Sequence, residues 1–79
     1  MKFETGKKYR LISTESFVTP KVGMIVYVKG LEKPIENYPC YRGFVTTNLD
    51  LDEHYSDEDT GEFCLYFLNL ENALEEIPE

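Results

Sequence analysis

A single histidine, His54, would have to serve as the general base if a Ser, Cys or Thr of this chain acted as a nucleophile. It lies in the run Asp50-Leu51-Asp52-Glu53-His54-Tyr55, where the carboxylates favour the charged imidazolium and weaken the ring as a base at neutral pH. Paired carboxylates could perform acid–base chemistry instead, but a chain of 79 residues has little room for the buried cleft that separates their pKa values. We therefore predict no catalytic residues and no enzymatic activity.

Three residues offer the sulfur and nitrogen ligands that zinc prefers: Cys40, His54 and Cys64. Zinc sites in proteins take four ligands, usually with a local pair such as Cys-x-x-Cys. Here the three residues are fourteen and ten positions apart, and none of them has a close partner. The spacing predicts that zinc is not bound.

Calcium is a closer alternative, because several carboxylates fall in one short stretch of the chain. Counted from Asp57, however, Gly61 is the fifth residue of a loop rather than the sixth, and no glutamate stands at the twelfth position. The EF-hand spacing therefore fails. We expect a solvated acidic loop, no bound metal and no cofactor.

The same carboxylates support a different kind of site. Residues 48–62, termed the acidic segment, contain seven acidic side chains within thirteen positions, with Tyr55 in the middle as a rigid anchor; the seven are Asp50, Asp52, Glu53, Asp57, Glu58, Asp59 and Glu62. One interpretation is a surface that binds a partner. The alternative is a charged loop that only keeps the chain in solution.

The two halves of the sequence carry opposite charge. Residues 1–42 hold eight bases and four acids, a net charge of +4, whereas residues 43–79 hold eleven acids and no base, a net charge of −11. Nucleic acid binding needs clustered Lys and Arg, so the total charge of −7 disfavours direct contact with DNA or RNA. The expected partner is a protein with a basic surface.

Aromatic residues outnumber what a small core requires. The candidates for exposed positions are Phe17, Tyr38, Tyr41, Tyr55 and Tyr66. Tyrosine is favoured at protein interfaces, because it offers a large contact area at a low cost in entropy. We predict that Phe17 in the first loop and Tyr38, just before the third strand, contribute to an apolar contact patch.

Period-2 alternation of apolar and polar residues predicts four strands, at residues 8–13, 24–29, 40–47 and 63–68. Pro and Gly mark the segments between them, 14–22 and 30–39, as loops. Residues 69–77 fit either a short helix or a helical turn followed by a last strand, and we favour the second. This order predicts a mostly β fold, a small barrel of four to five strands with a short terminal helical turn.

Length and composition limit the class of protein. Seventy-nine residues make one domain, residues 1–79, and a content of 42% apolar residues suffices for one small core. The longest apolar run, residues 24–28, is far too short to insert in a membrane. The first residues lack the apolar stretch of a secretory signal, so we expect a cytoplasmic protein whose Cys40 and Cys64 are reduced and buried. A disulfide between them is the alternative.

Three short motifs carry a family resemblance: Gly6-Lys7-Lys8-Tyr9-Arg10-Leu11-Ile12, Val22-Gly23-Met24-Ile25-Val26 and Leu74-Glu75-Glu76-Ile77. Their layout resembles that of small SH3-like barrel proteins encoded by bacteriophage accessory genes. The Ala-Leu-Tyr-Asp-Tyr-like run of signalling SH3 domains is absent. The resemblance implies a host-takeover protein that inhibits a host component of transcription, replication, cell division or nuclease action by direct contact.

Two hypotheses of function follow. The first is a non-enzymatic protein-binding inhibitor that uses a mixed acidic and aromatic surface. The second is a DNA mimic, whose carboxylates occupy the basic groove of a nucleic-acid-binding protein. High salt would abolish binding by a mimic but weaken an apolar-anchored complex only slightly.

Overall fold

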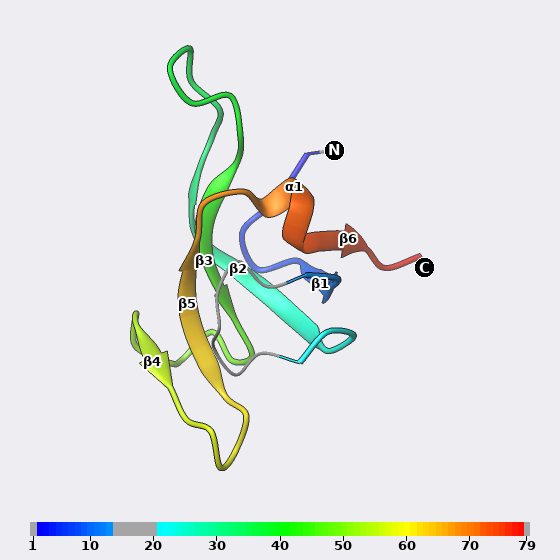
Figure 1. The fold of residues 1–79 in the computed structure, drawn as a ribbon, viewed down its shortest axis with the longest axis vertical. Helices are drawn as coiled ribbons and strands as arrows, with labels where there is room; N and C mark the ends of the chain where they lie inside the picture. The colour runs from blue at the N-terminus through cyan, green and yellow to red at the C-terminus, as the bar shows by residue number, and fades with distance from the viewer. Residues whose placement is uncertain (1, 14–20, 79) are drawn as a thin grey trace.

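The computed structural model describes residues 2–13 and 21–78. Within them, the chain forms six strands and one helical turn (Figure 1): β1 (Lys8–Leu11), β2 (Ile25–Glu32), β3 (Arg42–Thr46), β4 (Tyr55–Ser56), β5 (Phe63–Phe67), α1 (Leu70–Ala73) and β6 (Leu74–Glu76). The prediction of a mostly β fold is confirmed. So is the prediction that the tail forms a helical turn followed by a last strand.

All six strands belong to one antiparallel sheet with the order β4-β5-β3-β2-β1-β6. The last strand returns to pair with the first, with Leu74 opposite Leu11. A closed barrel would require the two edge strands to pair with each other. No pairing joins β4 to β6 in the part of the chain that the structure describes, so the sheet is not closed into the predicted barrel. It also has six strands rather than the predicted four to five.

The inner face of the sheet builds the core. Alternate side chains of the strands point to this face, as the period-2 pattern predicts, and they are almost completely buried. Phe3, α1 and the start of β6 cover them. The core residues are Phe3, Tyr9, Leu11, Val26, Val28, Val45, Phe63, Phe67, Leu70, Ala73 and Leu74.

Helix α1 is a single turn because of the residues at its two ends. Asn69 caps the first turn, where its side-chain oxygen accepts hydrogen bonds from the backbone N–H groups of Glu71 and Asn72 at 3.1 and 3.3 Å. Leu74 already has extended backbone angles and begins β6. The N–H of Leu70 donates to the carbonyl of Tyr41 at 3.0 Å, so α1 is fastened to the residue that precedes β3.

Strands β2 and β3 form a long hairpin with a bulge. The sequence predicts that the second strand ends before Gly30, but β2 continues to Glu32 because Gly30 adopts a φ of 63° and the register shifts between Lys29 and Glu32. Opposite the bulge, a Cβ atom on Gly43 would lie only 3.3 Å from the carbonyl oxygen of Gly30. Glycine therefore permits the close approach of the two strands here.

The two cysteines are free and lie in different environments. Cys64 on β5 is completely buried, as predicted. Cys40 is only half-buried, so the prediction that it belongs to the core is wrong. The reason is its position before β3 begins at Arg42, where the chain returns from the exposed tip of the hairpin.

No helix within residues 2–13 and 21–78 is long and apolar enough to cross a membrane.

Candidate protein-binding surface

The outer face of the sheet carries the other set of alternating side chains. Across β2, β3 and β5, Lys29 lies opposite Phe44, and Phe44 lies opposite Tyr66. A parallel row joins Tyr27 to Thr46, Thr46 to Cys64, and Cys64 to Tyr55. This face is therefore a mixture of aromatic and polar groups rather than a uniformly solvated surface, and we term it the outer face.

The first part of the acidic segment folds back over this face. The Lys29 ammonium group donates hydrogen bonds to the backbone carbonyls of Leu51 at 2.6 Å and Leu49 at 3.4 Å. Lys29, a base from the positively charged half of the sequence, thus binds the backbone of the negatively charged half. The carboxylates of this part, Asp50, Asp52 and Glu53, remain exposed.

His54 also helps to hold the acidic segment against the sheet. Its ring packs edge-on against Phe44, with ring centroids 5.2 Å apart and an interplanar angle of 80°. Its backbone has a φ of 71°, which turns the chain into β4. The contact gives His54 a packing role on the outer face.

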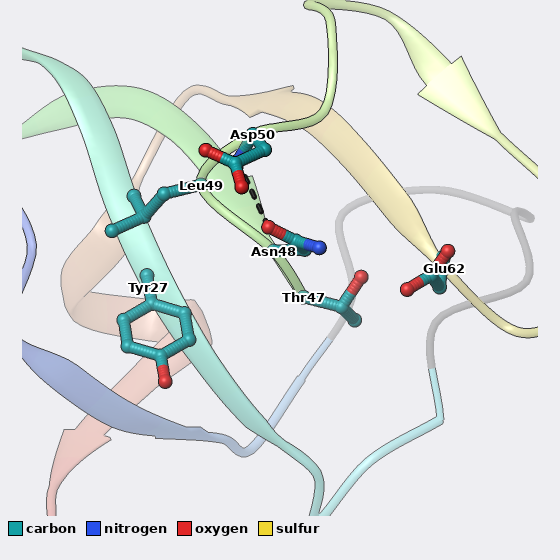
Figure 2. A pocket seen from close by; sticks show the side chains of 6 residues that line it. All are labelled: Tyr27, Thr47, Asn48, Leu49, Asp50 and Glu62. Atoms are coloured by element: carbon teal, nitrogen blue, oxygen red, sulfur yellow. Dashed lines mark hydrogen bonds between the residues drawn. The ribbon is translucent and has the colours of Figure 1, made fainter.

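A buried hydroxyl fixes the start of the acidic segment. Thr46 Oγ1 lies 2.7 Å from the carbonyl oxygen of Asn48 and 2.9 Å from that of Phe63, and it accepts a hydrogen bond from the Asn48 N–H at 3.1 Å. Asn48 Oδ1 in turn accepts a hydrogen bond from the Asp50 N–H at 2.9 Å (Figure 2). The backbone at Asn48 and Asp50 therefore has a defined shape.

The second part of the acidic segment is a tight turn between β4 and β5. The Asp57 N–H donates to the Glu62 carbonyl, and the Gly61 N–H donates to the Asp57 carbonyl, both at 2.9 Å. Asp57 Oδ1 accepts hydrogen bonds from the N–H groups of Asp59 at 2.9 Å and Thr60 at 3.4 Å. Asp57 therefore shapes the turn, whereas Glu58 and Asp59 project from its tip and are exposed.

Tyr55 occupies the edge strand β4, beside this turn. Its side chain is 38% exposed, and its hydroxyl donates to Asp57 Oδ2 at 3.4 Å. Partial removal from water and the neighbouring Asp57 carboxylate both raise the pKa of Tyr55, since each disfavours the phenolate. Tyr55 is thus a neutral, partly exposed aromatic group within an acidic surface.

In the part of the chain that the structure describes, hollows border the acidic segment at two places. One, of about 410 Å³, is bounded by Tyr27, Thr47, Asn48, Leu49, Asp50 and Glu62 (Figure 2). The other, of about 260 Å³, is bounded by Lys21, Met24, Glu58, Asp59, Thr60 and Gly61. The first hollow lies between β2 and the two ends of the acidic segment. The second lies between the tip of the turn and the residues that precede β2.

The structure gathers most of the predicted site residues but separates one of them. Tyr38 lies in the β2–β3 hairpin tip, at the opposite end of the longest axis from the turn that contains Glu58 (Figure 1). Its hydroxyl donates to the Leu68 carbonyl at 2.8 Å, and the Arg42 guanidinium lies 4.5 Å from its ring centroid. Tyr38 therefore has local partners far from the acidic segment. Phe17 lies outside the described residues.

Two residues of this surface were not predicted from the sequence, Tyr27 and Leu49. Tyr27 alternates with the buried Val26 and Val28, and this pattern could have placed it on the opposite face of the strand. Leu49 is an apolar residue in a polar segment and is 40% exposed. An exposed apolar residue beside carboxylates was the available signal.

Among the described residues, no three His, Cys, Asp or Glu side chains lie close enough together to hold a metal ion. Cys64, the buried thiol, has its pKa raised by burial, which disfavours the reactive thiolate.

Comparison with protein-family models, with curated proteins and with solved structures gave no match. The function is therefore inferred from the geometry of the outer face and the acidic segment.

Proposed function

We propose that this protein is a non-enzymatic protein-binding module whose acidic segment contacts a basic surface of a partner protein. The observation that carries the proposal is the pair of hydrogen bonds from Lys29 to the backbone of Leu49 and Leu51, because it holds the first part of the segment against the sheet while Asp50, Asp52 and Glu53 stay exposed. A surface that is ordered before binding loses less entropy when the complex forms. Its concentrated negative charge also speeds encounter with a basic partner.

Apolar groups within the acidic surface support a protein partner. Tyr55 and Leu49 are 38% and 40% exposed, and both lie in the acidic segment itself. Protein interfaces combine aromatic or aliphatic contacts at the centre with charged groups at the rim. The acidic segment offers both kinds of group on neighbouring elements.

The finer assignment to the SH3-like barrels of bacteriophage accessory proteins is part of the proposal. It is supported by the end of the chain, where the helical turn α1 leads into the terminal strand β6, the order expected of a small barrel. On this assignment the protein acts in the cytoplasm of a host cell. It inhibits a host protein of transcription, replication, cell division or nuclease action by covering a basic surface.

A second candidate is a DNA mimic, and the exposure of Asp52, Glu53, Glu58 and Asp59 favours it. Such a protein would use charge alone, so its affinity would collapse between low and high salt. A binder that also uses Tyr55 and Leu49 would keep most of its affinity. The salt dependence of the isolated complex therefore separates the two candidates.

The proposal is tested by quantitative capture of partners from host-cell lysate, with the double variant Glu58→Lys/Asp59→Lys compared with the wild type. Both residues are exposed at the tip of the turn, so their replacement leaves folding nearly unchanged. The matched control is Glu4→Lys/Glu36→Lys, which makes the same change in net charge at exposed positions outside the acidic segment.

We expect the Glu58→Lys/Asp59→Lys variant to lose the partner and the control to retain it. Equal capture by the two variants would show that binding responds only to net charge or uses another surface, and it would overturn the proposal.

A further inference from the structure

The larger hollow combines an aromatic wall with an acidic rim. Figure 2 shows Tyr27 on β2 and Leu49 above it on one side, Glu62 on the other side, and Thr47 and Asn48 between them. Its volume of about 410 Å³ is at the lower end of the range of small-ligand sites and suits one long side chain.

The apolar side of the hollow is accessible from solvent. The ring of Tyr27 is half-buried and is seen broadside in Figure 2, and Leu49 beside it is 40% exposed. An aromatic face attracts a cation that lies over it, because the π electrons make the face negative. A planar guanidinium group also stacks on such a ring.

The rim of the hollow is negative, and none of the described residues that line it is a base. Its two charged lining residues are Asp50 and Glu62. Lys29, on the same strand as Tyr27, is bonded to the carbonyls of Leu49 and Leu51. Lys8 pairs with Tyr27 across β1 and β2, but it lines a separate hollow with Lys7, Ile77 and Pro78. A cation from another molecule would therefore meet two carboxylates here.

The floor of the hollow is held in place by hydrogen bonds. The Thr47 N–H donates to the Phe63 carbonyl at 3.1 Å, and the Phe63 N–H donates to Thr47 Oγ1, also at 3.1 Å. Asn48 Oδ1 accepts the Asp50 N–H at 2.9 Å. The site is thus shaped before a ligand arrives, which lowers the cost of binding.

We propose that this hollow receives an arginine side chain of the partner protein, with the guanidinium group over the Tyr27 ring and its charge attracted by the carboxylates of Asp50 and Glu62 at the rim. The inference rests on the proposed function, because it names the chemical group of the basic partner that the acidic surface selects. Arginine fits better than lysine, since its planar and weakly hydrated head stacks on an aromatic ring.

The test uses small probes, so it does not depend on a known partner. N-acetyl-arginine methylamide is titrated into ¹⁵N-labelled protein, with the citrulline derivative as the uncharged analogue and the lysine derivative as the point-charge analogue. We expect saturable shifts confined to the amides of residues 27, 47–50 and 62, with affinity on the order of millimolar because a single side chain buries little area. The lysine derivative should bind more weakly and the citrulline derivative should not bind.

Two variants check the named contacts. Glu62→Gln removes one carboxylate but keeps the backbone carbonyl that accepts from Asp57, and Tyr27→Leu removes the aromatic face. Each should weaken the arginine probe about threefold to fivefold. Glu36→Gln, a loss of the same charge in the opposite hairpin tip, should leave binding unchanged. Glu62→Gln keeps the test decisive even if Tyr27→Leu fails to fold.

The outcomes distinguish this inference from the proposed function. Shifts scattered over all acidic residues, equal response to arginine and citrulline or to arginine and lysine, or unchanged binding by Glu62→Gln would each overturn the arginine site. Partner capture that is lost in Glu58→Lys/Asp59→Lys would still support the proposed function in that case. Conversely, capture that never depends on the acidic segment would overturn the proposed function, whatever the probes show.

Discussion

The Lys29 ammonium group lies 2.6 Å from the carbonyl oxygen of Leu51, and this bond joins the basic half of the sequence to the acidic half. The contact is made to the backbone, so it fixes the path of the acidic segment without neutralising a carboxylate. Lys29 is half-buried beneath that segment, in the same row of the outer face as Phe44. A base of the positively charged half therefore also helps to position the negatively charged half.

Replacement of Lys29 by Met should release residues 48–54 from the sheet while keeping the aliphatic part of the side chain. We expect a loss of about 1.5 kcal/mol in the free energy of unfolding, at the low end for a hydrogen bond to a charged group because Lys29 is only half-buried. Denaturant unfolding and hydrogen exchange at Leu51 measure the effect. Lys33→Met, at an exposed position, is the control. Equal stability of the two variants would contradict the role of Lys29.

Alkaline pH should weaken the outer face at Tyr66. The Tyr66 hydroxyl donates a hydrogen bond to the Glu32 carboxylate, and this bond, followed by partial burial, raises the pKa of Tyr66. The folded state therefore favours the neutral phenol. Its contribution to stability is complete below the unfolded-state pKa of about 10 and is lost as the pH rises through the higher native value.

The measurement is a ¹³C NMR titration of the Tyr66 ring carbon that bears the hydroxyl. Glu32→Gln should lower the pKa of Tyr66 toward its ordinary value, because the acceptor no longer carries a negative charge. Glu36→Gln, in the hairpin tip, should leave it unchanged. A native-like titration of Tyr66 in Glu32→Gln would show that Glu32 is not the cause.

The sequence predicts the strands where alternation is strong, and it fails where a local signal has two meanings. Val26, Tyr27 and Val28 alternate clearly, so β2 could be located. Gly30 looks like the start of a turn, but it is a bulge within β2, and composition alone does not separate these two uses of glycine. Strand β4 has two residues and exists only because Tyr55 and Ser56 pair with β5.

The sequence also predicted only part of the candidate site, for a similar reason. The carboxylates are visible in the sequence because their charge is a local property. The hollow is not, because it depends on Tyr27 and Leu49 meeting across more than twenty residues of chain, through the bond from Lys29 to Leu51. Such a contact is decided by the tertiary structure. The same holds for Cys40, whose exposure follows from where β3 begins.

The two thiols should differ sharply in reactivity. Cys64 is buried and its pKa is raised by burial, so it should resist alkylation until the protein unfolds. Cys40 is half-buried and should react in the native state. Cys64→Ala should cost about 1 kcal/mol or more through lost packing, and Cys40→Ala less. Mass spectrometry of the labelled protein decides which thiol reacts, and faster labelling of Cys64 would contradict its burial.

Asp57 should differ from the two acids that follow it, although all three are equivalent in the sequence pattern. Its Oδ1 atom accepts hydrogen bonds from the N–H groups of Asp59 and Thr60, and it is only half-buried beside the edge strand. Asp57→Ala should lower the free energy of unfolding by about 1 kcal/mol, because those two donors lose their partner. Asp57→Asn keeps an Oδ1 acceptor and should retain the turn, whereas Glu58→Ala should have almost no effect.

Hydrogen exchange at the amides of Asp59 and Thr60, together with denaturant unfolding, measures these differences. Faster exchange in Asp57→Ala but not in Asp57→Asn would assign the effect to the acceptor atom rather than to the charge. The same result justifies the choice of Glu58 and Asp59 for charge reversal, because a change at Asp57 alters the shape of the surface as well as its charge. If Asp57→Ala exchanges no faster than Glu58→Ala, the turn holds itself together through its backbone bonds between Asp57 and Glu62. Asp57 would then contribute only its negative charge to the surface, and not the shape of the turn.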